Sequence, residues 1–335
     1  MRARNPRPSA KRDRRGADEA LRGLVYHIII SHTGEAMKLT DYDILFDLPK
    51  GEYDGRGVDG VRTVTWRAED SLEVACHPIV HISAEAKREA KRRRTTPAMA
   101  KINARNTERH MMRLIEANFT TEAVVVTGTY PYPTEDYAMC NLRELAEAYN
   151  ARKLPWEMER VRMDVRNWLA RLRRIVLKAG GCPRDFRWIV RIEEGKDQPA
   201  PGIPSRFHFH AVVEGPGLDS MVVKALWEDK HGTARTDALG LKDDGAARLA
   251  RYFNKQKSGG RWWSHSRNLK IVEPTVSDRK MSRRRLAAIA AEVRVNGREI
   301  FEKLYPGFKV VELPEVRYSD YVAGAYIYCR MRRRE

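Results

Sequence analysis

Two segments in the second half of this 335-residue chain restrict its fold more than any other feature. Residues 186–194 (FRWIVRIEE) and 206–214 (RFHFHAVVE) alternate large apolar side chains with polar ones. This alternation is typical of β-strands that bury one face and leave the other for polar groups. A loop rich in proline and glycine joins the two segments, so we expect them to pair as an antiparallel hairpin.

The segments around this hairpin predict an α+β fold. An apolar strand is expected over residues 123–133, and a helix over 157–178, where apolar residues recur at helical spacing until Gly180 and Gly181 end the run. Further helices are expected at residues 83–116, 220–230, 245–257 and from Ser282 onward. The order strand, helix, paired strands, helix predicts a central, mostly antiparallel sheet with helices packed on it.

We divide the chain into three parts on this pattern. Residues 1–20 are rich in arginine and proline and are predicted to form a disordered basic tail. Residues 21–94 contain short β-like runs followed by a basic helical stretch, KREAKRRR, and predict a small N-terminal accessory β unit. Residues 95–335 are predicted to carry the main α+β domain, with a C-terminal extension that ends in the strand-like segment YVAGAYIYCRMRRR.

The chain is strongly basic, which indicates a polyanionic partner. It has 63 lysine and arginine residues against 45 acidic residues, a formal charge of +18. Nucleic acid is the commonest partner of proteins this basic. No apolar stretch approaches the length that spans a bilayer, and the four cysteines lack the CxxC spacing of zinc sites. We therefore expect a cytoplasmic protein with no membrane partner.

The polar face of the hairpin carries a candidate metal site. His208 and His210 project from the same side of their strand because alternate residues share a face. The same rule puts Glu193 on the polar face of the preceding strand, whereas Glu194, the competing third ligand, falls on the core side. Two histidines and a carboxylate suit Mn²⁺ or Mg²⁺ and leave positions open for phosphate oxygens. The alternative, that all three are polar surface residues, stays open on this evidence.

A second motif places a tyrosine among cations in the segment ARLARYFNKQ. On a helix, Arg248, Tyr252 and Lys255 fall at i, i+4 and i+7 along one stripe, while Leu249 and Phe253 form another. A phenol must be activated before it attacks phosphorus, since its ordinary pKa is about 10. Lys255 would stabilise the phenolate and the charge that grows on the phosphate. The alternative is a surface tyrosine on a basic DNA-binding helix.

Other cations and aromatic residues are candidates for DNA contact. Arg248 and Arg261 would bind phosphate, and Trp262, beside Arg261, would stack on unpaired bases. Trp263 is an equal candidate for that stacking, and the alternative is that the two rings are split between core and surface. Basic segments at residues 87–109 and 282–298 would add phosphate contacts and a steep dependence of affinity on salt.

In this order, the motifs resemble those of the rolling-circle replication initiators (Rep) of bacterial plasmids and phages, in the HUH endonuclease superfamily. HFHAVVEG resembles the metal motif of the family, and YFNK resembles its tyrosine motif. KINARNTERHMMRLIEANF followed by VVVTGTY resembles the first conserved region, and WWSHSRNLK and GAYIYCRMRRR resemble further blocks. The similarity runs from about residue 95 to the end. Gly128 departs from it, because the family usually has a larger apolar residue there, and the loop between Glu193 and His208 is longer than typical.

The resemblance implies a ferredoxin- or RRM-like fold and an enzyme with a single catalytic tyrosine. Tyr252, assisted by Lys255 and by a metal on His208, His210 and Glu193, would nick single-stranded or hairpin origin DNA, leave a 5′-phosphotyrosine and a 3′-OH primer, and later rejoin the strand. No GxxxxGK[ST] phosphate loop is present, so a host helicase would separate the strands for a host DNA polymerase. A relaxase or transposase with the same chemistry, or a non-catalytic origin-binding repressor, are the alternatives.

Overall fold

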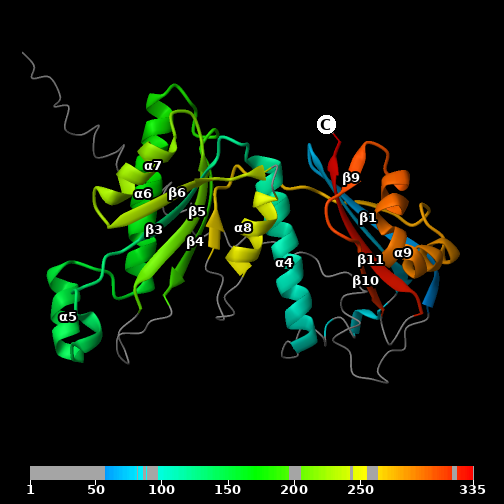
Figure 1. Cartoon of the computed structure of the whole chain (residues 1–335), viewed down its shortest axis with the longest axis horizontal. Helices are drawn as coiled ribbons and strands as arrows, with labels where there is room; N and C mark the ends of the chain where they lie inside the picture. Colours follow the sequence, from blue (N-terminus) through cyan, green and yellow to red (C-terminus); the bar gives the residue numbers. More distant parts are fainter. Residues whose placement is uncertain are drawn as a thin grey trace, which may run out of the picture. The chain divides into compact units, whose positions relative to one another are not determined.

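The structure is a computed structural model, and it describes residues 57–80, 82–85, 88, 97–195, 205–241, 244–254, 263–318 and 323–334. These residues form six α-helices and two sheets in which all strand pairs are antiparallel (Figure 1). The predicted α+β class is therefore confirmed. Among the described residues, no helix combines the length and the apolar character that crossing a membrane requires.

The chain separates into two compact units, and the division differs from the expected boundary at residue 95. The first unit contains the described residues of Thr120–Leu239 and Ser258–Leu269, and the second those of Glu35–Phe119, Gly240–Lys257 and Lys270–Glu335. The strands expected to form an accessory unit instead share a sheet with the C-terminal strands. Such pairing joins segments far apart in the sequence, so no local pattern reveals it. The predicted basic tail lies outside the described residues.

The first unit is built around a five-stranded sheet with the order β6-β3-β5-β4-β7. Its elements along the chain are β3 (Val124–Thr129), the short 3₁₀ helix η2 (Tyr137–Met139), α5 (Leu142–Ala151), α6 (Met158–Lys178), β4 (Arg187–Glu194), β5 (Phe207–Glu214), α7 (Ser220–Glu228), β6 (Thr233–Ala238) and β7 (Trp263–His265). The series β3-α6-β4-β5-α7-β6 is the βαββαβ arrangement of ferredoxin-like folds. The ferredoxin-like topology predicted for this part of the chain is thus present.

The predicted elements of this unit lie where the sequence places them. Strands β4 and β5 pair as the expected hairpin. Helix α6 ends where Gly180 adopts a φ of 85°, a left-handed conformation that glycine tolerates without strain. Strand β6 is not predicted by the sequence pattern, because its residues TARTDA are mostly polar and do not alternate.

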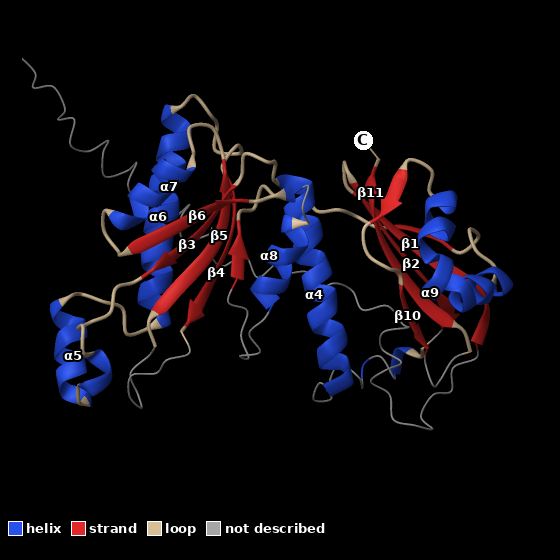
Figure 2. Cartoon of the chain, in the orientation of Figure 1, coloured by secondary structure: helices blue, strands red, loops and turns tan. Residues whose placement is uncertain are grey.

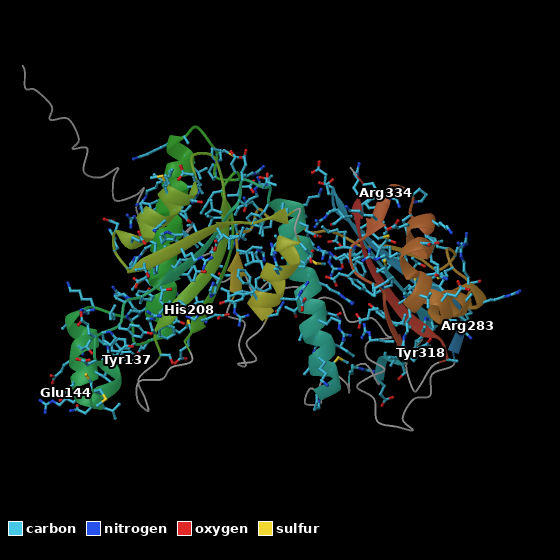
Figure 3. All side chains as sticks on the ribbon, viewed as in Figure 1. Tyr137, Glu144, His208, Arg283, Tyr318 and Arg334 are labelled. Atoms are coloured by element: carbon cyan, nitrogen blue, oxygen red, sulfur yellow. The ribbon has the colours of Figure 1, made fainter. Side chains whose placement is uncertain are left out.

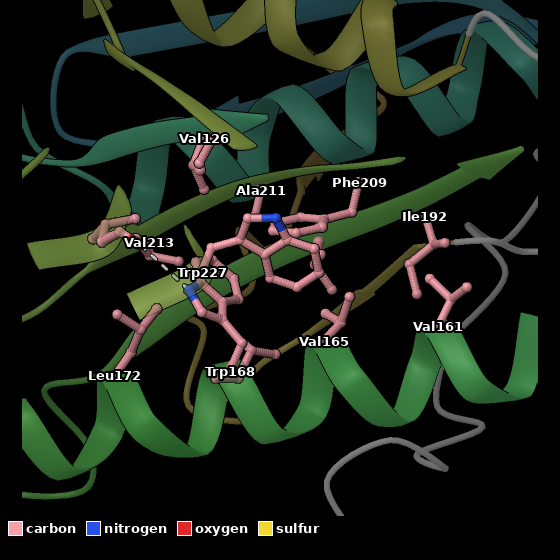
Figure 4. Close-up of a cluster of buried hydrophobic side chains, with 14 of the residues drawn as sticks. Val126, Val161, Val165, Trp168, Leu172, Ile192, Phe209, Ala211, Val213 and Trp227 are labelled. Carbon is pink, nitrogen blue, oxygen red and sulfur yellow. Dashed lines mark hydrogen bonds between the residues drawn. The ribbon is translucent and has the colours of Figure 1, made fainter. Parts of the chain in front are cut away.

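Helices α6 and α7 cover one face of this sheet with an apolar core (Figure 2). Trp168 of α6 and Trp227 of α7 are fully buried against Phe209 of β5, with ring centroids 4.9 and 4.6 Å from that of Phe209 (Figure 4). The apolar residues predicted for the buried face of the hairpin all belong to this core: Trp188, Val190, Ile192, Phe207, Phe209, Ala211 and Val213. The other face of the sheet is therefore left to the polar residues.

The second unit is built around a six-stranded sheet. Its elements are β1 (Gly57–Arg67), β2 (Ser71–Val80), α4 (Pro97–Asn118), α8 (Gly245–Asn254), β8 (Thr275–Ser277), α9 (Arg283–Leu304), β9 (Phe308–Val310), β10 (Glu315–Tyr318) and β11 (Ala325–Arg333). The strand order is β10-β11-β2-β1-β8, and β9 pairs with β11. Helix α9 packs on one face through an apolar cluster that includes Val74, Cys76, Ile327, Cys329, Leu286, Val293 and Phe301.

The opposite face of this second sheet is charged yet buried. Glu73 accepts hydrogen bonds from Arg113 of α4 at 3.2 Å and from the Tyr328 hydroxyl at 2.6 Å. Arg330 donates to Glu116 of α4 at 2.7 Å. Both faces of β2 are thus covered, which explains why all of its residues are buried. Removal of one partner from such a pair would leave a buried charge unpaired and strongly destabilise the unit.

The sheet of the first unit leaves room for glycine alone at position 128. Gly128 lies opposite Phe209 in the pairing of β3 with β5, and a Cβ on Gly128 would overlap the Phe209 ring, with Cζ only 2.5 Å away. The glycine at position 128 therefore has a packing reason. The Phe209 ring on β5 occupies the space that a side chain at position 128 of β3 would need.

We predict that Gly128→Ala lowers the free energy of unfolding by about 1–3 kcal/mol, because the added methyl group overpacks the core. Urea unfolding of Gly128→Ala, Phe209→Leu and the double variant would measure the coupling. The smaller leucine should make room for the methyl group, so the double variant should lose less stability than the sum of the single variants. Strictly additive effects would contradict the packing explanation.

Candidate metal centre

Three potential metal ligands converge on the polar face of the β4–β5 hairpin. Glu193 lies directly opposite His208 in the strand register, and His210 follows two residues further along β5. One ligand atom from each of the three residues lies within 4.8 Å of the others. His208 is labelled in Figure 3, at the hairpin of the first unit. The structure therefore brings together the three metal ligands that the sequence predicts.

The Glu193 carboxylate is buried and surrounded by nitrogen atoms. Its Oε2 lies 3.4 Å from Nε2 of His208, and its Oε1 lies 2.6 Å from Nε of Arg191. The contact with Arg191 is close but not aligned as a hydrogen bond, and no described residue donates one to Oε1. The ion pair with Arg191 is the partner of this oxygen. A divalent cation fits the group as a whole, because carboxylate oxygen and imidazole nitrogen are ligands of Mn²⁺ and Mg²⁺.

The electrostatics of the group favour the protonation states that metal binding requires. Burial acts to raise the pKa of Glu193, but the hydrogen bond with His208 and the charge of Arg191 outweigh it, so the pKa lies below its ordinary value. Burial, followed by repulsion from His208, lowers the pKa of His210 to about 4. At neutral pH the carboxylate is ionised and His210 is neutral, which are the forms that bind a cation.

Thr127 of the neighbouring strand orients one of the histidines. Its hydroxyl oxygen lies 2.9 Å from Nδ1 of His210, because the two residues are paired across β3 and β5. A hydroxyl that accepts a hydrogen bond from Nδ1 leaves the lone pair of Nε2 for a metal and fixes the ring. From the sequence, Thr127 and Thr129 share a strand face and either help to shape the site or are buried strand threonines. The partner of Thr127 depends on which strand lies beside it.

The alternative third ligand, Glu194, has a different environment. It pairs with Phe207 across the hairpin and accepts a hydrogen bond from the backbone N–H of Ser205 at 3.2 Å. The group of potential ligands found among the described residues contains Glu193 and not Glu194. This arrangement agrees with the strand parity that favours Glu193.

An aromatic pair borders the site on the edge strand β7. Trp263 lies opposite Arg191 in the pairing of β4 with β7 and so shares its face of the sheet. The Trp263 ring stacks on His265, with centroids 5.6 Å apart, and both side chains are half-buried. The sequence motif offers no sign that this segment joins the sheet beside the metal ligands. Arg261 and Trp262, the predicted DNA contacts, lie outside the described residues.

Tyr252 and Arg248 belong to helix α8 of the second unit. Both are exposed, Tyr252 by 39%, whereas Leu249 and Phe253 on the other stripe are buried. Within this unit, α4 and α8 form a groove of about 570 Å³. Tyr252 lines this groove with Lys101, Arg105, Glu108, Arg248 and Arg251. Lys255 lies outside the described residues.

No family model matches the sequence, and neither the curated proteins nor the solved structures contain a match to it.

We predict that Mn²⁺ binds this centre and that Glu193→Gln, His208→Ala and His210→Ala each weaken binding by more than about 100-fold, since each removes a ligand. Thr127→Val should weaken binding by about 10-fold, the lower end of the range for residues that orient ligands. Isothermal titration calorimetry of the purified chain with MnCl₂ would measure the affinities. Glu194→Gln is the matched control and should bind as the parent does. Loss of binding in Glu194→Gln, with binding kept in Glu193→Gln, would reverse the ligand assignment.

We also predict that His210 makes the metal-free protein sensitive to acid. Between its ordinary pKa of 6.5 and its folded pKa of about 4, the unfolded chain takes up a proton at residue 210 that the folded chain does not. The free energy of unfolding should therefore fall as the pH decreases through this window, by up to about 3 kcal/mol from this group. Urea unfolding in the presence of EDTA should show a smaller decrease for His210→Asn than for the parent. Equal decreases in both proteins would show that His210 does not carry the effect.

Proposed function

We propose that this protein is a metal-dependent, single-tyrosine DNA-nicking enzyme that initiates rolling-circle replication. The observation that carries the proposal is the group formed by Glu193, His208 and His210 on the polar face of a ferredoxin-like sheet. Two histidines and one carboxylate leave coordination positions open for the oxygens of a substrate. In a chain with a formal charge of +18, a phosphodiester of DNA is the substrate that charge favours.

The chemistry divides between the metal centre and the tyrosine. A divalent cation, Mn²⁺ or Mg²⁺, when bound by the three ligands, supplies Lewis-acid polarisation of the scissile phosphate. Arg191 and the two imidazoles hold the Glu193 carboxylate in its ionised form. Thr127 fixes the ring of His210. These residues keep the centre in one geometry, so that little reorganisation accompanies the reaction.

Tyr252 is the proposed nucleophile. Its phenol oxygen forms a bond to phosphorus as its proton leaves, and the bond from phosphorus to the 3′ oxygen breaks. The 3′ oxygen takes up a proton and becomes the primer hydroxyl, while the 5′ end stays on the protein as a phosphotyrosine. The cations that line the groove around Tyr252 favour both the phenolate and the phosphate. Because the phosphodiester energy is retained, the reverse reaction rejoins the strand.

Neighbouring residues are proposed to hold the DNA strand. Trp263, half-buried beside Arg191, offers a ring on which an unpaired base would stack. The sequence adds three candidates to this proposal. Lys255 would stabilise the phenolate, and Arg261 and Trp262 would contact the DNA. The DNA partner is a single-stranded or hairpin origin in the cytoplasm, which a host helicase opens and a host DNA polymerase copies.

We predict that the chain forms a covalent adduct with single-stranded DNA from the origin of its own genetic element when Mn²⁺ is present. The adduct should carry a label placed at the 3′ end of the DNA and not one placed at the 5′ end, because the 5′ phosphate stays on the tyrosine. Tyr252→Phe should reduce adduct formation by at least about 10³-fold, measured on denaturing gels. EDTA should abolish it.

Tyr318→Phe is the matched control for this experiment, since Tyr318 is an exposed tyrosine of the same unit. It should form the adduct as the parent does. An adduct that persists in Tyr252→Phe would remove the proposed nucleophile, and cleavage that resists EDTA would remove the proposed role of the metal.

A further inference from the structure

A cation and two aromatic rings form a stack beside the start of β5, outside the group of metal ligands. The Arg206 guanidinium lies over the Tyr132 ring, 4.0 Å from its centroid. The Tyr132 ring stacks on Tyr137, with centroids 4.4 Å apart and an interplanar angle of 14°. Tyr137 and His208, both labelled in Figure 3, belong to the first unit. We call Arg206, Tyr132 and Tyr137 the Arg206 stack.

The Arg206 stack begins one strand step from a metal ligand. Arg206 directly precedes β5, and its carbonyl oxygen accepts a hydrogen bond from the backbone N–H of Gly195 at 3.2 Å, so the hairpin pairing continues through it. Alternation along the strand therefore places Arg206 on the same side as His208. The Cα atoms of these two residues are separated by a step of about 7 Å. A nucleic-acid strand with one phosphate at the metal centre would bring a neighbouring phosphate close to Arg206.

The charge of Arg206 is not compensated within the described part of the chain. No described carboxylate forms an ion pair with it, and its contact is with an aromatic ring. The arginines of the neighbouring strand β4 differ in this respect. Arg191 pairs with Glu193 at 2.6 Å, and Arg187 pairs with Glu214 at 2.8 Å. Because Arg206 is half-buried, water screens its charge only in part, which favours an anionic ligand.

The stack also orients the guanidinium for a phosphate. A guanidinium that lies flat on an aromatic ring keeps its N–H donors in its own plane, directed past the edge of the ring. Pairs of these donors bind two phosphate oxygens at once. The Tyr132 ring is itself fixed, because Tyr137 stacks on it and Arg152 donates a hydrogen bond to the Tyr132 carbonyl oxygen at 2.7 Å. Arg206 therefore loses less side-chain entropy when it binds a ligand.

We propose that Arg206 binds the phosphate next to the one at the metal centre, and that Tyr132 and Tyr137 position its guanidinium. Two consecutive phosphates of one strand would be held, one by the metal centre and the other by Arg206. A single contact leaves a strand free to turn about the metal, whereas two contacts determine which phosphate lies there. This inference rests on the proposed function, because it takes a phosphodiester as the ligand of the metal centre.

Stacking of a base on Tyr132 fits the observations less well. An aromatic ring has two faces, and Arg206 and Tyr137 are too close to the Tyr132 ring to share one of them. A base would have to displace one of these two partners before it could stack. The N–H donors of Arg206, in contrast, are directed away from the ring. The geometry thus favours a phosphate on the cation over a base on the ring.

The test measures the binding of two short ligands to the full chain in MgCl₂. The thymidine dinucleotide dTpdT has one phosphodiester, and the trinucleotide dTpdTpdT has two. Phosphorus NMR titrations would give both affinities for the parent, for Arg206→Ala and for Arg143→Ala. Arg143 is an exposed arginine of α5 in the same unit and provides the matched control. Thermal melting would verify that each variant keeps its fold.

The parent should bind the trinucleotide about 10-fold more tightly than the dinucleotide, because the second phosphate gains a charge-assisted contact. In Arg206→Ala this gain should fall below about 2-fold, while the dinucleotide binds as it does to the parent. Arg143→Ala should behave as the parent does. A gain that persists in Arg206→Ala would overturn the proposal. An equal loss for both ligands would also overturn it, since Arg206 would then not be specific to the second phosphate.

A chemical change in the ligand provides an independent control. A trinucleotide with one linkage replaced by an uncharged methylphosphonate keeps its bases and its size but has one charge fewer. It should bind the parent about as weakly as the dinucleotide does, and Arg206→Ala should not weaken its binding further. Tight binding of this ligand to the parent would show that the third nucleoside, and not the second phosphate, produces the gain. That result would overturn the proposal.

The positioning role of the ring has its own test. Tyr132→Phe keeps the ring under the guanidinium and should keep the gain from the second phosphate. Tyr132→Leu removes the ring and should lower the gain by about 3-fold, since the cation loses its contact with the aromatic face. Equal effects of the two variants would overturn the positioning role of Tyr132.

A failure of this inference and a failure of the proposed function would appear in different measurements. Replacement of MgCl₂ by EDTA should weaken binding of the dinucleotide, since the metal holds its phosphate. Dinucleotide binding that EDTA does not change would contradict the role of the metal in the proposed function. The gain from the second phosphate would still decide the role of Arg206, because both ligands are compared under the same conditions.

Discussion

The register of the β4–β5 hairpin is the constraint on which the candidate metal centre depends. Glu193 opposes His208 because the strands pair with that register and no other. A slip of β5 by one residue against β4 would turn His208 and His210 into the core and expose Phe209. The apolar contacts of Trp168 and Trp227 on the opposite face resist such a slip. The core thus determines the geometry of a site that it does not touch.

Much of this site could be predicted from the sequence, for a simple reason. Side chains on a strand repeat every two residues, so the alternation of Phe207 and Phe209 with His208 and His210 settles which face each occupies. The contribution of Thr127 could not be predicted in the same way, because it depends on β3 lying beside β5. Trp263 depends in turn on β7 pairing with β4. Which strands become neighbours in a sheet depends on the whole chain, so a local sequence pattern does not predict them.

The second unit shows where local patterns mislead. The segment that becomes β2 looks like part of an independent β unit, yet its neighbours are β1 on one side and β11 on the other. Glu73 and Tyr328 are polar residues that a sequence pattern assigns to a solvent-facing side. They are buried instead, because arginines of α4 complement them. A single sequence does not show whether the charged face of a sheet is covered by an oppositely charged helix or exposed to solvent.

The pairing of β2 with β11 has a consequence for how the protein is made. Cys76 and Ile327 are partners in this ladder, so some 250 residues must leave the ribosome between the synthesis of one strand and the arrival of the other. The sheet of the first unit is complete at His265, well before β11 is synthesised. We therefore expect the unit with the candidate metal centre to fold first during translation, while β2 still has an unpaired edge. This unpaired strand edge is the part of the nascent chain that we expect to be most prone to aggregation or to chaperone binding.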